Sequence, residues 1–546
     1  MKRHIREDYY VVGEGILGFD EKKKPVCRRP STIAETRKFR FSRLGEQGEP
    51  VDDALRMALA TAMTSGANQP DSSGPPIPAG FTYLGQFIDH DLTLDNTAAA
   101  LGEDVTVAEL IQGRSPALDL DNLYGRGPQN PEDRKFYSDA IHLKVGTTAP
   151  AEFPANDPLT NREFEGFDLP RVGVGSSKAE RRAALIPDRR NDENLAVAQT
   201  HLAFIRFHNR VVDVLAGKGV PSTFLFAAAR KLVVTHYQWM IRTDFLPRIV
   251  DAEIVEDVFR HGRRFFEPRA CSDDRPTMPI EFSVAAYRLG HSMIRGAYQW
   301  NRVFRAGGPG PIASLALLFT FSGTSGVLSP DGSLDDPESG SFEHLPSNWI
   351  ADFRRLYDFS EAGRNDLRVD GRESNQAKRI DTQLVDPLKQ LPLGAFGGRG
   401  TSPHEQELNL AFRNLTRANM VKLASGQQMA KTMGIQPLTA SQIIGGNGGA
   451  VLGGLPKAQT DALVAHTPLW FYILREAELK NGRLTGVGGR IVAEVFHRAM
   501  EVSRISILRD PGWRPSLGPD ASTFRMVDLL LFAFEGKAEL LNPLGS

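Results

Sequence analysis

The first chemically informative feature is a histidine between two aspartates, in the segment FTYLGQFIDHDLTLD of residues 81–95. On a helix, spacings of i, i+3, i+4 and i+7 would place four polar side chains on one face, namely Gln86, Asp89, His90 and Thr93. Asp91 would lie about 100° round the helix from His90 and so point elsewhere. The interleaved aromatic and aliphatic residues favour a buried site for this polar face, and the alternative is a solvated polar turn.

A second stretch, SPALDLDNLYG at residues 115–125, offers oxygen atoms at every second position to a hard cation. These are the Ser115 hydroxyl, the Ala117 carbonyl, and the carboxylates of Asp119 and Asp121. Calcium takes about six to eight oxygen ligands, and Asp91 could complete such a set. The stretch lacks the glycine and the terminal glutamate of an EF-hand loop. The alternative is an exposed strand that turns Leu118 and Leu120 inward.

A third stretch, DRRNDENLAVAQTHLAFIRFHN at residues 188–209, leads into a helix. Arg190 precedes the helix, and Glu193 lies in its first turn, where a carboxylate can simply stabilise the helix end. His201 and His208 are seven residues apart on one face, and no third metal ligand is spaced near them. We expect both histidines to be ordinary packing residues of this helix.

A fourth stretch, FSVAAYRLGHSMIR at residues 282–295, carries His291 on an otherwise apolar helix. Arg288 precedes His291 by three residues and Tyr287 precedes it by four, so the three side chains would lie close together. Gly290 removes the side chain beside His291 and would let a flat group approach the helix. An imidazole that emerges from an apolar helix is what an axial ligand of haem iron requires. The alternative is a core histidine with its hydrogen bonds satisfied.

Together, these stretches resemble the animal-type haem peroxidases of the peroxidase–cyclooxygenase superfamily. GQFIDHD looks like the distal motif, SPALDLDNLYG like the calcium loop, DRRNDEN like the segment with the distal arginine and glutamate, and YRLGHSMI like the proximal histidine helix. A fifth match, AFRNLTRANMVKL at residues 411–423, carries Asn414 and Arg417. The resemblance runs in order over residues 81–423, and GRLTGVGGRIVAEVF at residues 482–496 is also similar.

On the proximal side, the resemblance implies haem b as the cofactor, with His291 as the iron ligand. Asn414 would accept the other ring N–H of His291, which fixes the tautomer and raises the basicity of the ligand. Arg288 and Arg417 would pair with the haem propionates, for which guanidinium geometry is well suited.

On the distal side, the resemblance implies that His90 removes a proton from hydrogen peroxide and returns it to the leaving oxygen. Gln86 and Arg190 would hold the peroxide and stabilise the charge that develops as the O–O bond breaks, which yields an oxoferryl intermediate. Asp89 and Glu193 match family positions that form ester bonds to haem methyl groups, and the sequence leaves open whether these bonds form here.

The resemblance also implies one calcium ion, held by Asp91, Ser115, the Ala117 carbonyl, Asp119 and Asp121. Because Asp91 adjoins His90 in the sequence, a rigid cation site at Asp91 would fix the orientation of the His90 ring.

The expected function is therefore the hydrogen-peroxide-dependent oxidation of small donors such as halides, thiocyanate or phenols, with a part in the response to oxidative stress. One alternative is a fatty-acid dioxygenase of the same superfamily. Such members place a tyrosine three residues before the proximal histidine, where this chain has Arg288, with Tyr287 one position earlier. The other alternative is a protein that binds haem without turnover.

Helical patterns dominate the rest of the chain, so we expect a mainly α fold with little β structure. The predicted helices cover residues 195–217 after the caps Asn191 and Asp192, residues 222–245 with a break at Pro247, a segment that starts near Pro279, residues 409–420 and residues 487–502. Residues 65–80 and 323–340 read as loops. We expect residues 1–80 to form an arm and loop packed on a single catalytic domain of residues 81–546.

The composition excludes several classes of protein. The 546 residues contain 65 basic and 66 acidic side chains, a formal net charge of −1, which argues against a partner with a strong charge such as nucleic acid or a membrane surface. The longest apolar run, residues 312–321, is about half of what a membrane-spanning helix needs. Cys27 and Cys271 are the only cysteines and exclude a disulfide framework. They leave the oligomeric state open.

The first ten residues carry positive charge without an apolar stretch behind them, so we expect an intracellular, cytoplasmic bacterial-type peroxidase. A truncated amino terminus would look the same, and secretion by another route stays open.

Overall fold

The computed structural model describes residues 16–19, 25–28, 39–65, 76–323, 343–391 and 404–546, except residues 98, 273, 372 and 373. The predicted loop at residues 323–340 lies outside this range apart from Gly323, as does most of the loop predicted at residues 65–80. Helices make up most of the regular structure, and the sheets have two or three short strands, so the predicted mainly α fold is confirmed.

The α-helices are α3 (Asp53–Met63), α4 (Gly80–Leu92), α5 (Asp121–Tyr124), α6 (Lys178–Arg182), α7 (Leu195–Gly217), α8 (Ser222–Met240), α9 (Leu246–Ile249), α10 (Ala252–His261), α11 (Gly290–Met293), α12 (Leu315–Thr320), α13 (Leu410–Met420), α14 (Gly426–Thr432), α15 (Ala440–Gly445), α16 (Lys457–Ala465), α17 (Leu469–Leu479), α18 (Gly486–Val502), α19 (Met526–Ala533) and α20 (Ala538–Leu541). The strands are β1 (Ile16–Phe19), β2 (Pro25–Arg28), β3 (Phe39–Ser42), β4 (Ile111–Gln112), β5 (Gly146–Thr147), β6 (Glu165–Asp168), β7 (Thr277–Pro279), β8 (Ala297–Tyr298) and β9 (Ala313–Ser314).

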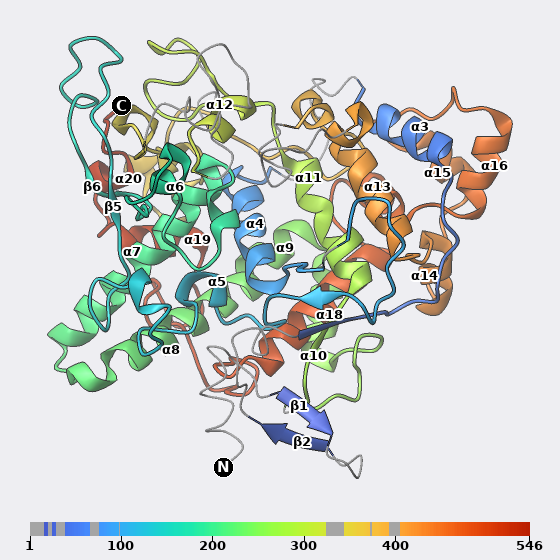
Figure 1. Cartoon of the computed structure of the whole chain (residues 1–546), viewed down its shortest axis with the longest axis horizontal. Coiled ribbons are helices and arrows are strands. Elements are labelled where there is room, and N and C mark those ends of the chain that lie inside the picture. The colour runs from blue at the N-terminus through green and yellow to red at the C-terminus, as the bar shows by residue number, and fades with distance from the viewer. Residues whose placement is uncertain are drawn as a thin grey trace.

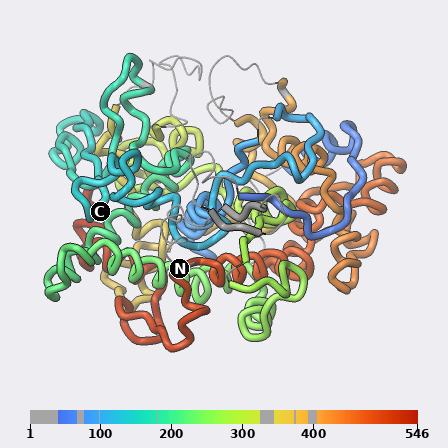
Figure 2. The backbone as a smooth tube through the Cα atoms, turned by 60° about the horizontal axis from the view of Figure 1, so that its bottom comes forward, coloured from blue at the N-terminus to red at the C-terminus, as the bar shows by residue number. Residues whose placement is uncertain are grey.

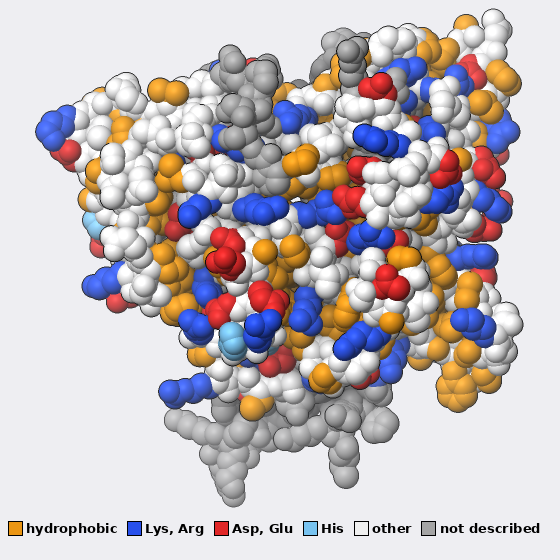
Figure 3. Space-filling view, turned by 180° about the vertical axis from the view of Figure 1, so that it is seen from behind, with side chains coloured by type: hydrophobic (Ala, Val, Ile, Leu, Met, Phe, Trp, Pro, Cys, Tyr) orange, Lys and Arg blue, Asp and Glu red, His pale blue; other side chains and the backbone are white. Residues whose placement is uncertain are grey.

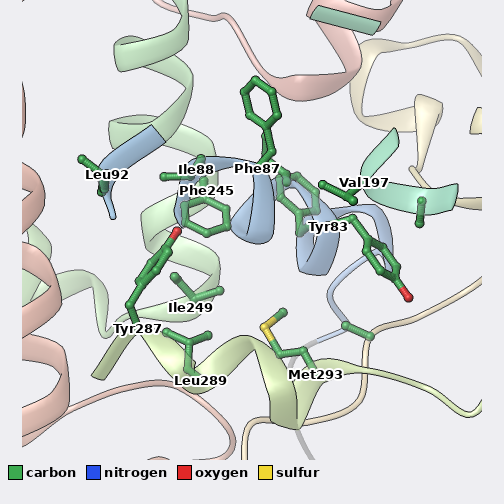
Figure 4. Close-up of a cluster of buried hydrophobic side chains, with 14 of the residues drawn as sticks. Tyr83, Phe87, Ile88, Leu92, Val197, Phe245, Ile249, Tyr287, Leu289 and Met293 are labelled. Carbon is green, nitrogen blue, oxygen red and sulfur yellow. The ribbon is translucent and has the colours of Figure 1, made fainter. Parts of the chain in front are cut away.

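Helix α4 runs through the middle of the molecule, with other helices around it (Figures 1 and 2). It packs against α7 and α11. Figure 4 shows apolar side chains of α4 packed with Tyr287, Leu289 and Met293, which come from the segment that carries His291. Burial of this apolar surface is the main force that holds the helix in place. The segment is thus helical and buried as far as Leu92, and the alternative of a solvated turn is wrong. Thr93 is extended and follows the helix.

Helix α7 spans the predicted residues 195–217, but neither of the two predicted caps, Asn191 and Asp192, caps it. Its N-cap is Asn194, whose side chain accepts a hydrogen bond from the Val197 N–H. Residues Arg189–Asp192 instead form a separate 3-10 turn, capped by Asp188. This turn lies against α4 and brings Arg190 and Asn191 to the end of that helix.

The predicted break at Pro247 is wrong. Helix α8 continues through a π-helical turn, Ile241–Phe245, into α9 without leaving the helical conformation. Pro247 lies in the first turn of α9, directly after the π-helical turn, so the helix changes its hydrogen-bond pattern where the proline lacks a backbone N–H.

The segment after Pro279 is helical but irregular. Pro279 itself belongs to β7, and the chain then passes through a π turn (Glu281–Ala285), a 3-10 turn (Ala286–Leu289) and α11. We call residues 281–293 the proximal segment. The changes in helix type mean that side-chain positions cannot be read from regular i, i+3 and i+4 spacing here.

A three-stranded sheet connects distant parts of the chain to the proximal segment. Strand β3 pairs antiparallel with β4 and parallel with β7, with Arg40 opposite Thr277. The buried Glu281 carboxylate accepts hydrogen bonds from the N–H groups of Leu44 and Gly45 at 2.9 and 3.0 Å. Residues 39–45 therefore support the start of the proximal segment. The division into an arm and a catalytic domain stays a prediction.

The surface carries both signs of charge. On the face shown in Figure 3, basic and acidic side chains lie interspersed among hydrophobic and uncharged ones, as expected from the net charge. Within the described residues, no helix is long and apolar enough to cross a membrane. Cys271 is exposed and free, and the side chain of Cys27 lies outside the described residues.

Candidate active site

His90 is held at the carboxyl end of α4 by an asparagine from the neighbouring turn. Its ring is buried, and its Nδ1 lies 2.8 Å from Oδ1 of Asn191. Burial, with the positive charge of Arg190, lowers the pKa of His90 to about 3. The ring is therefore neutral at pH 7. Because the Asn191 oxygen can only accept, Nδ1 of His90 carries the proton, and Nε2 keeps a lone pair.

Gln86 lies one turn before His90 and is held at both ends of its amide. Its Nε2 donates to Oε2 of Glu193 at 3.2 Å, and its Oε1 accepts from Nδ2 of Asn194 at 3.0 Å. Asn194 is also the N-cap of α7. Burial raises the pKa of Glu193 to about 7. Gln86 therefore keeps one orientation, set by the start of α7.

Arg190 ties the 3-10 turn to the end of α4. Its Nη2 donates to the carbonyl oxygens of His90 and Thr93 at 3.3 and 2.7 Å, and it pairs with Asp188 at 2.7 Å. Asp188 also pairs with the buried Arg114 at 2.6 Å. Burial alone would raise the pKa of Asp188, but the charges of Arg114 and Arg190 outweigh it and hold this pKa well below its ordinary value. The guanidinium of Arg190 is thus fixed mainly by Asp188.

Asp89 lies between the two halves of the predicted site. Its Oδ1 accepts from the Thr93 hydroxyl at 3.0 Å. Burial raises the pKa of Asp89, and the positive charges of Arg190 and Arg288 oppose this rise. The charges of both arginines affect this carboxyl, so Arg190 at the end of α4 and Arg288 on the proximal segment both lie near Asp89.

His291 is partly buried at the start of α11, and its Nδ1 lies 2.9 Å from the amide of Asn414 on α13. The structure thus brings together the two residues that the sequence pairs. The amide, however, has the opposite orientation to the predicted one. Nδ2 of Asn414 faces the ring, and Oδ1 accepts from Nη1 of Arg288 at 3.4 Å. Arg288 accounts for this orientation, because its guanidinium can only donate.

Three arginines gather near His291. Arg288 is largely buried, and its Nε lacks a hydrogen-bond partner among the described residues. Burial, together with the positive charges of Arg417 and Arg413, lowers the pKa of Arg288 to about 10. Arg413 lies one helical turn before Arg417 on α13. Because like charges repel, a bound anion between these arginines would be stabilised.

Gly290 and Trp470 complete the surroundings of His291. A Cβ atom placed on Gly290 would meet nothing within 4 Å, so the predicted clearance beside His291 is present. Trp470 packs edge-to-face on the His291 ring, with ring centroids 6.4 Å apart, and its Nε1 donates to the Arg288 carbonyl at 3.3 Å.

Three of the predicted calcium ligands form one buried cluster. Asp91, Asp119 and Asp121 each place a carboxylate oxygen within 4.8 Å of the others. Within the described residues, Oδ1 of Asp91 and both carboxylate oxygens of Asp119 lack a hydrogen-bond partner. Burial and the charge of Asp121 raise the pKa values of Asp91 and Asp119 well above their ordinary range. Buried carboxylate oxygens in such an arrangement are able to ligate a divalent cation.

The other two predicted ligands lie in the same loop. The Ser115 N–H donates to Oδ2 of Asp121 at 3.3 Å, and Ala117 is fully buried between the two residues in the sequence. The roles of the Ser115 hydroxyl and the Ala117 carbonyl stay predictions. The loop is not a strand, because Leu120 adopts a left-handed conformation with φ of 61°. The strand alternative is therefore wrong, although Leu118 and Leu120 are indeed buried.

A partly open cavity of about 310 Å³ lies beside this cluster, with Ser115, Asp121 and Arg114 in its wall. Arg114 lies 3.7 Å from Asp121 and also pairs with Asp188. The aspartate cluster and Arg190 are thus connected through two buried charged groups, Arg114 and Asp188.

The sequence patterns missed several residues of this site. Asp188 holds Arg190 and is itself paired with Arg114, Arg413 lies near Arg288, and Tyr237 donates to Asp91 at 3.2 Å. The spacing of Asp188, two residues before Arg190, was an available signal, and so was the spacing of Arg413 and Arg417. His201 was expected to be a packing residue, but it contacts Asn191 at 2.9 Å. His208 does behave as a satisfied core histidine, between Tyr124 and the Ile141 carbonyl.

Comparison with known sequences agrees with this geometry. Residues 94–310 match the family model for animal haem peroxidase. A peroxidase-like protein of Margaritifera margaritifera is 31% identical over 250 residues, which make up 40% of this chain and 32% of that protein. Human thyroid peroxidase is 24% identical over 194 residues, 34% of this chain and 19% of that protein. The matched part thus spans no more than about a third of either relative.

Solved structures show the same fold at low sequence identity. Peroxidase A of Dictyostelium discoideum superposes with a TM-score of 0.53 at 14% identity, over 92% of this chain and 94% of that one. A fatty acid alpha-dioxygenase of Arabidopsis thaliana gives a TM-score of 0.55 at 12% identity, over 99% of this chain and 85% of that one. Residues 94–310 are therefore similar to the animal haem peroxidase domain, and the described chain shares its fold with a peroxidase and a fatty acid alpha-dioxygenase.

Proposed function

We propose that this protein is a haem-dependent peroxidase that uses hydrogen peroxide to oxidise small donors. One observation carries the proposal: α4 and the proximal segment present two neutral histidines, His90 and His291, each with Nδ1 against a buried asparagine amide. The positive charges of Arg190 on one side and Arg288 on the other both lower the pKa of Asp89, which supports the assignment of the two halves to one site.

The residues on the proximal side fit a haem. A Cβ atom on Gly290 would meet nothing within 4 Å, so the chain is not tightly packed against this position next to His291. The positive charges of Arg288 and Arg417 repel each other, and two haem propionates would neutralise them. The haem supplies the iron that binds the peroxide and takes up its oxidising equivalents. Whether Asp89 and Glu193 form ester bonds to it stays a prediction, supported by their burial beside the same site.

The distal residues of this chain then handle the protons of the substrate. Nε2 of His90 accepts a proton from hydrogen peroxide and returns it to the oxygen that leaves as water. The amide of Gln86 is fixed by Glu193 and Asn194, so it can position the peroxide without reorganising. Arg190 adds a positive charge near the oxygen atoms as their bond breaks.

We further propose that Asp91, Asp119 and Asp121 hold one Ca²⁺, with Ser115 and the Ala117 carbonyl. The buried carboxylate oxygens without partners support this assignment. The cation would lock the end of α4, where His90 and Asp91 are adjacent.

The test is the visible absorption spectrum of the purified, haem-loaded protein before and after one equivalent of hydrogen peroxide. We expect a histidine-ligated ferric spectrum that changes on addition of peroxide and returns when bromide, thiocyanate or guaiacol is added. Comparing these donors would also rank them. A haem spectrum that is indifferent to peroxide would contradict the proposal.

A fatty-acid dioxygenase is the second candidate, and Tyr287 is the observation that favours it. Its hydroxyl is buried, lacks a hydrogen-bond partner among the described residues and lies near enough to Asp89 to be affected by its charge. Incubation with linoleate and oxygen separates the two candidates. Formation of hydroperoxide above the level of a His291→Ala control would favour the dioxygenase, and its absence would leave the peroxidase.

A further inference from the structure

Asn191 lies between two buried histidines. Its Oδ1 is 2.8 Å from Nδ1 of His90, and its Nδ2 is 2.9 Å from Nδ1 of His201 on α7. His90 is 5% exposed, and Asn191 and His201 are not exposed at all, so water does not compete for these contacts.

The single amide couples the two imidazole rings. An amide has one accepting end and one donating end, so it must treat the two rings differently. In the observed orientation, His90 donates from Nδ1 and keeps the lone pair on Nε2, while His201 accepts on Nδ1. If the amide were reversed, it would donate to His90, and the proton of that ring would move to Nε2. A base at Nε2 would then be lost.

His201 supplies the acceptor for the donating end of this amide. Its Nε2 is buried without a hydrogen-bond partner among the described residues, and its ring packs edge-to-face on Phe87 with centroids 5.7 Å apart. The hydrogen bond to Asn191 is therefore the contact through which His201 acts on its neighbours in the described part of the chain. That contact leads directly to His90.

The backbone around Asn191 is fixed independently of the two rings. Asn191 lies in the 3-10 turn capped by Asp188, and its N–H donates to the Asp188 carbonyl at 3.1 Å. Arg190 binds the same turn to the end of α4. The amide can thus rotate about its own side-chain bond, but it cannot leave its place between the rings.

We propose that Asn191 and His201 are positioning residues for His90, which hold its ring as the Nδ1–H tautomer so that Nε2 is the base. The proposal rests on the proposed function only for the use made of that base. The hydrogen-bond coupling itself is a property of the folded chain.

The decisive measurement is the tautomer of His90. The full chain, labelled with ¹⁵N-histidine and loaded with diamagnetic zinc protoporphyrin IX, gives ring-nitrogen NMR signals whose pattern separates Nδ1–H from Nε2–H. The His90 signals are identified by their loss in His90→Gln. We expect Nδ1–H in the wild type. In His201→Leu, which removes the acceptor for Asn191, we expect Nε2–H or a mixture.

Two variants serve as controls. His201→Gln keeps a carbonyl acceptor for Asn191 and should restore the Nδ1–H pattern. His208→Leu changes another fully buried histidine two turns further along α7, which contacts Tyr124 and Ile141, and should leave His90 unaffected. An Nε2–H pattern for His90 in the wild type, or an unchanged Nδ1–H pattern in His201→Leu, would overturn the proposal.

The rate of reaction with peroxide gives the second readout. In the iron-haem protein, His201→Leu should slow this reaction about 10- to 100-fold with an unchanged ferric spectrum, as for other partners that orient a functional histidine. His201→Gln should recover most of the rate. If the tautomer shifts as expected but neither the wild type nor any variant reacts with peroxide, the proposed function fails and the coupling stands.

Discussion

The two histidines of the site have the same kind of neighbour but opposite hydrogen bonds. His90 and His291 each place Nδ1 against an asparagine amide, at 2.8 and 2.9 Å. At His90 the amide presents its oxygen, whereas at His291 it presents its nitrogen. The difference arises at the far end of each amide, where Asn191 meets the neutral ring of His201 and Asn414 meets the guanidinium of Arg288.

We therefore expect the Asn191 amide to keep its orientation and the Asn414 amide to reverse its orientation when haem binds. The contact between Asn191 and His201 is short, buried and enclosed by protein. The contact between Arg288 and Asn414 is long, at 3.4 Å, and comes from a cation that carboxylates attract more strongly than an amide does. We expect haem propionates to draw Arg288 away, after which the Asn414 amide can turn and accept the His291 N–H. The fixed amide contacts the regular helix α4, and the amide that we expect to reverse contacts the irregular proximal segment.

The largest effect is expected from removing the distal base. His90→Ala should slow the reaction with hydrogen peroxide by about 10²- to 10⁴-fold, the usual contribution of a general acid–base residue. The haem content should be unchanged, because His90 does not hold the cofactor. Stopped-flow absorbance against peroxide concentration measures the rate. A rate within a few-fold of the wild type would remove His90 from the proposed mechanism.

The proximal pair can be tested by changing what its amide can do. Asn414→Leu should weaken haem binding about 10- to 100-fold, because the ligand loses its orienting partner. Asn414→Asp should bind haem within a few-fold of the wild type, since a carboxylate accepts from His291 but cannot donate to it. Transfer of haem between the variant and a competing apoprotein gives the affinities.

An equal loss in both Asn414 variants would mean that the donating orientation persists when haem is bound. The expected difference between the two asparagines, one with a fixed amide and one with an amide that reverses, would then be wrong.

The cation cluster should support the distal side alone. With Ca²⁺ at about 100 times its dissociation constant, binding adds about 2.7 kcal/mol to the stability of the fold. Chelation should therefore lower the Tm and slow the peroxide reaction while the haem stays bound. Calorimetric scans with Ca²⁺ and with EDTA measure the effect.

Asp119→Asn should reverse the order of stabilities. In EDTA it should melt above the wild type, because burial disfavours the charged form of Asp119 and an amide carries no charge, and in Ca²⁺ it should melt below the wild type. Glu132→Gln, at the rim of the neighbouring cavity, is the matched control and should respond to Ca²⁺ as the wild type does. A wild-type Tm that is indifferent to Ca²⁺ would contradict the cation site.

The smallest effect concerns Glu476 on α17, the helix that also carries Trp470 beside His291. Burial raises the pKa of Glu476 to about 8, although the N–H groups of Val487 and Gly488 oppose the rise. The folded state therefore favours the protonated acid. This contribution to stability is complete below the unfolded pKa of about 4.5 and is lost as the pH rises through about 8.

Glu476→Gln should remove this part of the pH dependence, so its stability relative to the wild type should increase between pH 5 and about 9. Urea unfolding at several pH values gives the difference. Parallel curves for the two proteins would show that the buried acid does not titrate in this range.

Many of the helices could be predicted because a regular helix leaves a pattern in the local sequence. Helices α4, α7, α13 and α18 follow apolar residues at helical spacing. The aspartate cluster was also accessible, since oxygen ligands at every second position suggest a cation. The proximal segment was only half predictable, because its π and 3-10 turns depend on packing against α17 and α18 and not on local pattern.

The contacts that give Asn191 and Asn414 opposite amide orientations could not be predicted. Asn191 reaches His90 and His201 only because residues 189–192 form their own turn before α7 begins. The amide of Asn414 takes its orientation from Arg288, which is 126 positions away in the sequence. Hydrogen-bond direction is set by the whole set of neighbours in space, and no spacing along the chain encodes it.

The sheet that joins β3 to β7 implies an order of events in assembly. Leu44 and Glu281 are 237 positions apart, so their contact closes a very long loop, and such contacts form after local helices because their entropic cost comes first. The early strand therefore reaches the proximal segment late, when the helices around it already exist. We therefore expect haem that arrives before this step to meet a proximal segment that is still free to adjust.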